Sequence, residues 1–188
     1  MQQKKYILSV FCLLALIGIS LLIKANYLSL KATLAQVLIQ HAWQQSIVRN
    51  SAVKPWPWAD TSIAGKLSIG DNDLMVLEGA NLRNLAFGPA RLSSSVDIFE
   101  TGNLVIFGHR DTHFAPLQYL RIGDKITFEH HDLKIYEISE IAIVADDQVA
   151  VTSPTMDDVI TLITCYPFEG LSSDAEQRYV VRAHAVTK

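Results

Sequence analysis

From Ile63 onward, the sequence consists of short apolar or alternating runs separated by turn residues, and this pattern most constrains the fold. Gly70-Asp71-Asn72 separates the first two runs, and residues 124–130 and 132–139 alternate apolar and polar side chains as a pair of half-buried strands does, within expected strands at 125–129 and 133–144. The remaining expected strands cover residues 64–69, 73–78, 104–108, 159–164 and 179–186. Many short strands at this spacing predict a mainly β domain, either a barrel or a sandwich.

An apolar stretch near the amino terminus predicts a membrane anchor. Tyr6 to Ile23 contains 18 residues without a charge and is flanked by lysines. At about 1.5 Å of rise per residue, a helix of this length just spans a bilayer core. A cleaved signal peptide is the alternative, but Ile23-Lys24-Ala25-Asn26 lacks a small-x-small cleavage site. We therefore expect residues 1–25 to form a cytoplasmic tip and a retained transmembrane helix.

A second helical pattern occupies residues 28–48, which contain neither glycine nor proline. Its apolar residues recur at spacings of three and four, so one face should dock on the domain or on a partner. The apolar stripe consists of Leu30, Leu34, Val37, Leu38 and His41, and a polar line consists of Gln36, Gln40 and Gln44. Pro55-Trp56-Pro57-Trp58 then favours extended backbone. Residues 26–58 should thus form a juxtamembrane amphipathic helix and linker before a folded domain at 59–188.

Composition excludes one class of partner and leaves the redox compartment open. The 16 basic and 19 acidic residues give a net charge of −3, which offers no reason to expect nucleic acid. The two cysteines, Cys12 and Cys165, lie in the apolar stretch and in the distal domain. We therefore expect no disulfide between them.

Cys165 is a candidate nucleophile because it ends the apolar run Thr161-Leu162-Ile163-Thr164-Cys165. Side chains begin to reach solvent at the end of a buried strand, which is where a reactive thiol is useful. A lone cysteine is more often a small buried hydrophobe. Here, however, His109 follows the expected strand 104–108 and Arg178 opens the last one, so both can converge on the thiol.

These segments resemble the sortases, which are membrane-anchored cysteine transpeptidases that join proteins to amine acceptors. Residues 161–165 are similar to the Thr-Leu-x-Thr-Cys signature, 104–110 to the strand that carries the histidine, and 178–183 to the final strand. The order of His, Cys and Arg agrees, and the resemblance covers roughly residues 60–188. The segments most similar to the Gram-negative subclass of marine proteobacteria, class GN, are residues 55–58, 108–114 and 165–168.

The resemblance implies an eight-stranded sortase-type β-barrel, with short helical turns at residues 81–86 and 115–120. It further implies a single-pass protein of the inner (cytoplasmic) membrane whose catalytic domain, residues 59–188, lies on the periplasmic side. The expected partners are a secreted protein with a C-terminal sorting signal similar to Leu-Pro-x-Thr-Gly and an acceptor that bears an amine. No cofactor is expected.

The implied roles divide among three residues. Cys165 would attack the carbonyl after the threonine of the signal and hold a thioacyl intermediate. His109 would protonate the leaving amine and then deprotonate the incoming one. Arg178 cannot serve as a base, because a guanidinium keeps its proton, so it would bind the substrate carbonyl or the oxyanion. Thr164, Asp111 and His113 are weaker candidates for substrate binding.

Several residue assignments have competitors. His113 lies four residues from His109 and could shuttle protons in its place, although no buried strand precedes it directly. Arg182 lies on the same strand as Arg178 and could replace it. Thr164 would either donate a hydrogen bond to the substrate or hold the turn before the nucleophile.

Other functions fit parts of the same pattern. His109, Asp111 and His113 could bind zinc in a hydrolase. However, Arg110 occupies the position at which a helical zinc-protease motif places glutamate, so we expect no metal. A cysteine hydrolase would use water in place of the amine. A membrane-tethered adaptor without catalytic activity would retain the fold and lack a reactive thiol.

Overall fold

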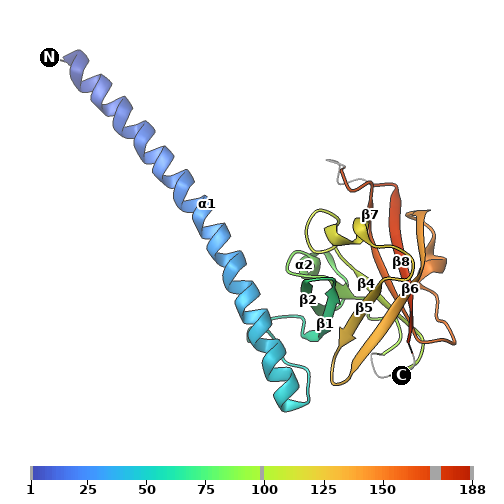
Figure 1. Ribbon diagram of the computed structural model, residues 1–188. Helices are drawn as coiled ribbons and strands as arrows, with labels where there is room; N and C mark the ends of the chain where they lie inside the picture. The colour runs from blue at the N-terminus through green and yellow to red at the C-terminus, as the bar shows by residue number, and fades with distance from the viewer. Residues whose placement is uncertain (1, 98–99, 170–174, 187–188) are drawn as a thin grey trace. The chain divides into compact units, whose positions relative to one another are not determined.

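The computed structural model describes residues 2–97, 100–169 and 175–186 (Figure 1). The chain divides into two compact units, Met1–Val37 and Leu38–Lys188. The first unit is helical, and the second holds all of the described strands.

One continuous helix, α1 (Gln2–Arg49), covers both the apolar stretch and the second helical pattern. The described large apolar side chains between residues 6 and 23 are exposed. The expected transmembrane helix is not supported. Within the described residues, no helix of the structure is long and apolar enough to cross a membrane.

The second unit contains a closed barrel of eight strands (Figure 1). The strands are β1 (Ile63–Ile69), β2 (Asn72–Glu78), β3 (Ala90–Arg91), β4 (Asn103–Phe107), β5 (Lys125–Glu129), β6 (Leu133–Ala145), β7 (Val159–Tyr166) and β8 (Gln177–Ala185). Around the barrel their order is β1-β2-β3-β4-β7-β8-β6-β5, in which only β2–β3 and β4–β7 are parallel. The mainly β prediction is confirmed, and the barrel is the correct choice between the two architectures.

Short helices complete the domain. They are α2 (Leu82–Leu85), η1 (Ala115–Tyr119) and η2 (Val149–Thr152). The first two lie in the expected turns at 81–86 and 115–120. The Asn81 side chain starts α2, because its oxygen accepts the N–H groups of Arg83 and Asn84. The sequence did not predict η2.

Alternation along the strands builds two apolar layers. One face of every strand except the short β3 contributes to the main core, which includes Leu104, Ile106, Ile160, Leu162, Val181 and Ala183. Phe114 and Leu117, from the η1 region, are fully buried in the same core. The intervening positions form a second buried cluster, which we call the outer-face cluster. It consists of Val105, Ile163 and Val180, with Leu92, Phe107, Val144 and Val151 packed against them.

The carboxyl-terminal part of α1 packs on the barrel through a face that differs from the predicted stripe. Ile39, Ala42 and Trp43 form a buried cluster with Ile63 and Leu77. Their spacing of three and four is helical, and the small Ala42 permits a close approach beside the large Trp43 ring. The predicted stripe counted leucines and valine, but Leu30, Leu34 and Val37 are exposed.

Candidate active site

Cys165 lies where β7 leaves the core. The first six residues of β7 are buried, and exposure begins at Cys165, which is half-buried and is not in a disulfide. Ile160 and Leu162 point into the main core, so Ile163 and Cys165, one and three positions further, belong to the opposite face of the strand. The thiol therefore lies on the outer side of the barrel, at the end of a rigid strand.

Arg178 lies directly opposite Cys165, because antiparallel β7 and β8 pair these two residues. Cβ atoms of directly opposed residues are about 4.5–5.5 Å apart, and both side chains project from the same face. Nη1 of Arg178 donates to the carbonyls of Ala175 (2.6 Å) and Gln177 (3.1 Å). Nη2 lies 3.8 Å from a carboxylate oxygen of Asp146. These contacts fix the orientation of the guanidinium, which belongs to the residue paired with Cys165.

Arg182, the competing arginine, is engaged elsewhere. It pairs with Thr161, so it lies four residues along β7 from Cys165. Its Nη1 lies 3.4 Å from a carboxylate oxygen of Glu140, and its Nη2 donates to the carbonyl of Val151 at 3.4 Å. The register thus favours Arg178 as the arginine that can contact a group bound to the thiol.

Two hydrogen bonds align the histidine segment with the cysteine strand. β4 and β7 run parallel, and just beyond β4 the N–H of Gly108 donates to the carbonyl of Ile163 at 3.2 Å. The Thr164 hydroxyl donates to the carbonyl of Gly108 at 2.7 Å. His109 and Cys165 are the next residues in the two segments, so they lie at the same end of the sheet. Thr164 is buried, and its proton serves this bond, which is the holding role rather than substrate contact.

Gly108 is required because the Phe114 ring packs against it. A Cβ at this position would lie 2.7 Å from ring carbons of Phe114, closer than such atoms approach. Phe114 is fully buried, and its N–H donates to the carbonyl of His109 at 2.9 Å. The backbone of His109 is therefore fixed on both sides, whereas its side chain is exposed.

His113 lies close to His109 and is electrostatically coupled to it. Burial lowers the pKa of His113, the neighbouring His109 lowers this pKa further, and Asp111 partly opposes the shift. His113 is consequently a neutral imidazole near pH 7. Its Nδ1 lies 3.4 Å from the hydroxyl of Thr112. His109 is the better placed proton shuttle, because it directly follows Gly108, which is hydrogen-bonded to the cysteine strand.

In the part of the chain that the structure describes, the side chains of Cys165 and His109 make no hydrogen bond to another protein group. Catalytic hydrogen bonds are often formed or tightened only in the complex with substrate. Both groups can therefore meet an incoming carbonyl and amine without first breaking an internal bond.

The geometry offers no support for a metal centre. Among the described residues, no group of three or more His, Cys, Asp or Glu side chains could hold a metal ion. The zinc alternative for His109, Asp111 and His113 therefore lacks a ligand set there. Asp111 lies near His113 and affects its pKa, which is the only contribution of this carboxylate that the structure defines.

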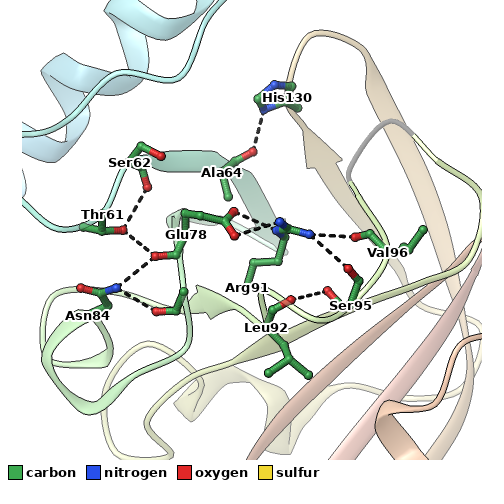
Figure 2. Close-up of polar contacts among 11 residues, drawn as sticks. Thr61, Ser62, Ala64, Glu78, Asn84, Arg91, Leu92, Ser95, Val96 and His130 are labelled. Atoms are coloured by element: carbon green, nitrogen blue, oxygen red, sulfur yellow. Dashed lines mark hydrogen bonds and ion pairs between the residues drawn. The ribbon is translucent and has the colours of Figure 1, made fainter.

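An ion pair fixes one edge of the outer-face cluster (Figure 2). The guanidinium of Arg91 makes two bonds of 2.8 Å to the carboxylate of Glu78 and donates to the carbonyl of Val96 at 2.9 Å. Such bidentate pairs fix both distance and orientation. Leu92 follows Arg91, and its N–H donates to the carbonyl of Val105 at 2.8 Å. The pair therefore holds Leu92 against the cluster that leads to Cys165.

An aromatic cluster borders the site, and the sequence did not predict it. Tyr166 and Tyr179 stack with ring centroids 6.2 Å apart, and Phe168 meets Tyr179 edge-on at 5.0 Å. Burial raises the pKa of Tyr179, and Tyr166 adds to the shift. Because Tyr166 follows Cys165 and Tyr179 follows Arg178, the rings tie the two strand ends together. The aromatic residues that follow the two motif residues were the available signal.

Comparison with known proteins places the three motifs within one family match. Residues 68–186 match the family model described as the sortase domain. Sortase D of Bacillus subtilis (strain 168) is 32% identical over 117 residues, which make up 61% of this chain and 59% of that protein. The chain thus spans about three fifths of the length of this curated relative.

Solved structures have the same barrel. Sortase A of Listeria monocytogenes matches with a TM-score of 0.60 and 27% identity, covering 66% of this chain and 88% of its own. A sortase D5 transpeptidase of Clostridium perfringens matches with a TM-score of 0.68, covering 82% and 99% of the two chains, and its 18% identity shows the fold alone. The family match spans most of the chain and includes His109, Cys165 and Arg178. On these grounds the chain belongs to the sortase family.

Proposed function

We propose that this chain is a cysteine transpeptidase, which cleaves a protein within a C-terminal sorting signal and joins it to an amine. The observation that carries this proposal is the direct pairing of Cys165 with Arg178 across β7 and β8. The alignment of His109 with the same strand end supplies the third group that acyl transfer needs. Membership of the sortase family supports the reaction class.

In the first half of the reaction, the Cys165 thiolate attacks the carbonyl carbon before the scissile bond. The electron pair of the carbonyl moves to its oxygen, and a tetrahedral oxyanion forms next to Arg178. The contacts of Arg178 with Ala175 and Gln177 use Nη1, so the remaining N–H groups of the fork can donate to this oxygen.

The tetrahedral intermediate then collapses, and one proton is transferred to the leaving group. The C–N bond breaks, and His109 donates its proton to the leaving amine, which leaves a thioester on Cys165. The acceptor amine attacks the thioester carbon and passes a proton to His109. The C–S bond breaks, and the thiolate is restored. Water in place of the amine gives hydrolysis through the same steps.

The proposal also covers the subclass of the enzyme, its sorting signal and its partners. We assign it to the Gram-negative subclass, and the sequences at 55–58, 108–114 and 165–168 support that assignment. The expected signal contains threonine and is similar to Leu-Pro-x-Thr-Gly. Its partners would be a secreted protein with this signal and an amine-bearing acceptor.

The proposed location is the inner membrane, with the catalytic domain on the periplasmic side. Residues 6–23 carry no charge, and their described apolar side chains are exposed on α1. Exposed apolar surface of this kind is unfavourable in water. Carbonate extraction of cell membranes tests the location. Retention of the full-length protein supports it, whereas a soluble protein or a shorter mature form contradicts a retained anchor.

The activity is tested by mass spectrometry of the full-length protein after incubation with a Leu-Pro-Glu-Thr-Gly peptide and triglycine as the amine. We expect a thioester adduct on the tryptic peptide that contains Cys165 and a ligated peptide product. Product without amine indicates a hydrolase. A thiol that alkylates slowly and forms no adduct favours the adaptor, and activity that chelators remove would contradict the cysteine mechanism.

A further inference from the structure

Among the described residues, the inner face of β7 is closed at Cys165 and the outer side of the barrel is the open one. The inner face of β7 is filled by the main core, in which Ile160 and Leu162 are fully buried. Ile163, two residues before Cys165 on the same face, belongs to the outer-face cluster. A peptide whose carbonyl reaches the thiol must therefore pass next to this cluster. Whatever covers the cluster determines how a peptide can lie there.

The connection between β6 and β7, residues 146–158, supplies that cover. It contains η2, and Val151 of η2 packs on the outer-face cluster. Val149 in the same turn is 72% exposed, so η2 has one side on the cluster and another towards solvent. The connection is thus an edge of the surface that leads to the thiol.

One buried side chain holds this connection in place. Nδ2 of Asn103 donates to the carbonyls of Val151 (3.2 Å) and Ser153 (3.0 Å). Oδ1 of the same amide accepts the hydroxyl of Thr161 at 2.6 Å. Arg182 adds a longer bond of 3.4 Å to the carbonyl of Val151.

The network specifies a single arrangement. Asn103 is 1% exposed and Thr161 is fully buried, so their polar atoms have no water to replace a lost partner. Each N–H of the Asn103 amide serves one carbonyl, and its oxygen faces a hydroxyl donor, so the amide cannot flip without opposing like groups. The Asn103 amide and the Thr161 hydroxyl are both satisfied, so displacing the connection would leave buried polar groups unpaired. Nε of Arg182 is buried without a partner among the described residues, so Arg182 contributes less to this network.

We propose that Asn103 is a positioning residue for substrate binding, which holds the β6–β7 connection as one wall of the peptide-binding surface beside Cys165. This inference rests on the proposed function in that it takes the ligand to be an extended peptide. Asn103 itself is buried and does not touch the peptide. It acts through Val151 and Ser153, whose carbonyls it holds.

The test uses Asn103→Asp in the full-length protein, because aspartate keeps the shape but loses both N–H donors and faces the two carbonyls with an acceptor. Cys165 is alkylated either with a Leu-Pro-Ala-Thr chloromethyl ketone or with iodoacetamide, and the second-order rates are compared. We expect the peptide reagent to react about tenfold more slowly than with the wild type, the size of one lost ordinary interaction. The iodoacetamide rate should stay within about twofold, because the thiol itself is unchanged.

Asn84→Asp is the matched control. Nδ2 of the buried Asn84 likewise donates to two carbonyls, those of Glu78 (3.0 Å) and Gly79 (2.8 Å), and neither residue belongs to the connection, so the variant separates general destabilisation from loss of the wall. The ratio of the two alkylation rates should not change in this variant. Limited proteolysis should cut the connection at 146–158 faster in Asn103→Asp than in the control.

The possible results distinguish the role of Asn103 from the proposed function. Equal peptide-reagent rates in wild type and Asn103→Asp, or equal losses with both reagents, would overturn the inference. An unchanged rate of proteolysis at 146–158 would also overturn it. Failure of the wild type to cleave or transfer the Leu-Pro-Glu-Thr-Gly peptide would instead contradict the proposed function, while the alkylation ratio still decides the role of Asn103.

Discussion

Strands β7 and β8 have polar side chains near both ends, and the two ends differ in how those groups are satisfied. At one end, Asp158 accepts the Lys134 ammonium at 2.7 Å and the Tyr136 hydroxyl at 3.3 Å. At the other end, Cys165 faces Arg178, and in the described residues its thiol has no internal hydrogen bond. A closed polar cluster, formed by Asp158 and two residues of β6, therefore lies just before the start of β7, and an open one lies near the end of β7.

The difference separates stability from function. Tyr136 is buried, and burial together with the Asp158 carboxylate raises the pKa of its phenol, so its proton stays in the internal bond. Groups that satisfy one another rigidify the fold but have little capacity left for a ligand. Groups that stay available at a strand end cost stability and can bind substrate. Substitutions at the two ends should consequently change different measurements.

The largest effect is expected for Cys165→Ala. Removal of the thiol abolishes adduct formation and peptide transfer, whereas the midpoint of thermal unfolding should move little because the side chain is small and half-buried. Product formation measured by mass spectrometry checks the first part, and circular dichroism the second. Cys12→Ala is the control and should retain full activity. Turnover that persists without Cys165 would contradict the mechanism.

His109→Ala should lower the transfer rate by about 10² to 10⁴, because one proton donor and acceptor is lost. His113→Ala should reduce it by no more than about tenfold, since His113 is the neighbour and not the aligned group. Transfer rates of the two variants, measured by mass spectrometry of the ligated product, compare the two imidazoles. If His113→Ala, rather than His109→Ala, removes activity, the assignment is reversed.

Arg178→Lys should lower kcat by about 10² to 10³, because lysine keeps the charge but lacks the planar fork beside the oxyanion. Arg182→Lys should instead raise KM modestly, because Arg182 contacts the Val151 carbonyl of the wall and is paired with Thr161, four residues before Cys165. Steady-state kinetics of the two variants separate these roles. A larger fall in kcat for Arg182→Lys would favour Arg182 as the oxyanion group.

The sequence predicted the barrel strands where the pattern was long and local. The expected strand at 125–129 matches β5, and the turns at 81–86 and 115–120, which the family resemblance implied, contain α2 and η1. β3 is only two residues long, which is too short for any periodicity to show. The packed face of α1 was also missed, because the choice between adjacent apolar faces depends on the partner surface.

The site residues could be predicted from the sequence because each motif lies at the end or the start of an expected strand. His109, Cys165 and Arg178 each follow or open an apolar run, and the parallel and antiparallel pairing brings them to one end. The contact of Asp146 with Arg178 was not predictable, because it depends on a register between distant strands. The same holds for Asn103, whose partners lie about fifty residues away in sequence. Side chains that act through non-local hydrogen bonds leave no local pattern.

The smallest effect is expected at the closed end, for Tyr136→Phe. Loss of the hydroxyl that donates to Asp158 should lower the free energy of unfolding by about 0.5–1.5 kcal/mol at neutral pH, without changing kcat or KM. The pKa of Tyr136 is raised in the fold, so the folded state keeps its proton at pH values where the unfolded chain loses it. The stabilisation from Tyr136 is therefore complete below about pH 10 and is lost as the pH rises towards the folded pKa. Urea unfolding followed from pH 8 to 11 should show a wild-type advantage that shrinks on the alkaline side. A wild-type advantage in unfolding free energy that does not depend on pH would show that the protonated phenol of Tyr136 is not the source of the stabilisation. A fall in kcat would show that the two ends of β7 and β8 are coupled.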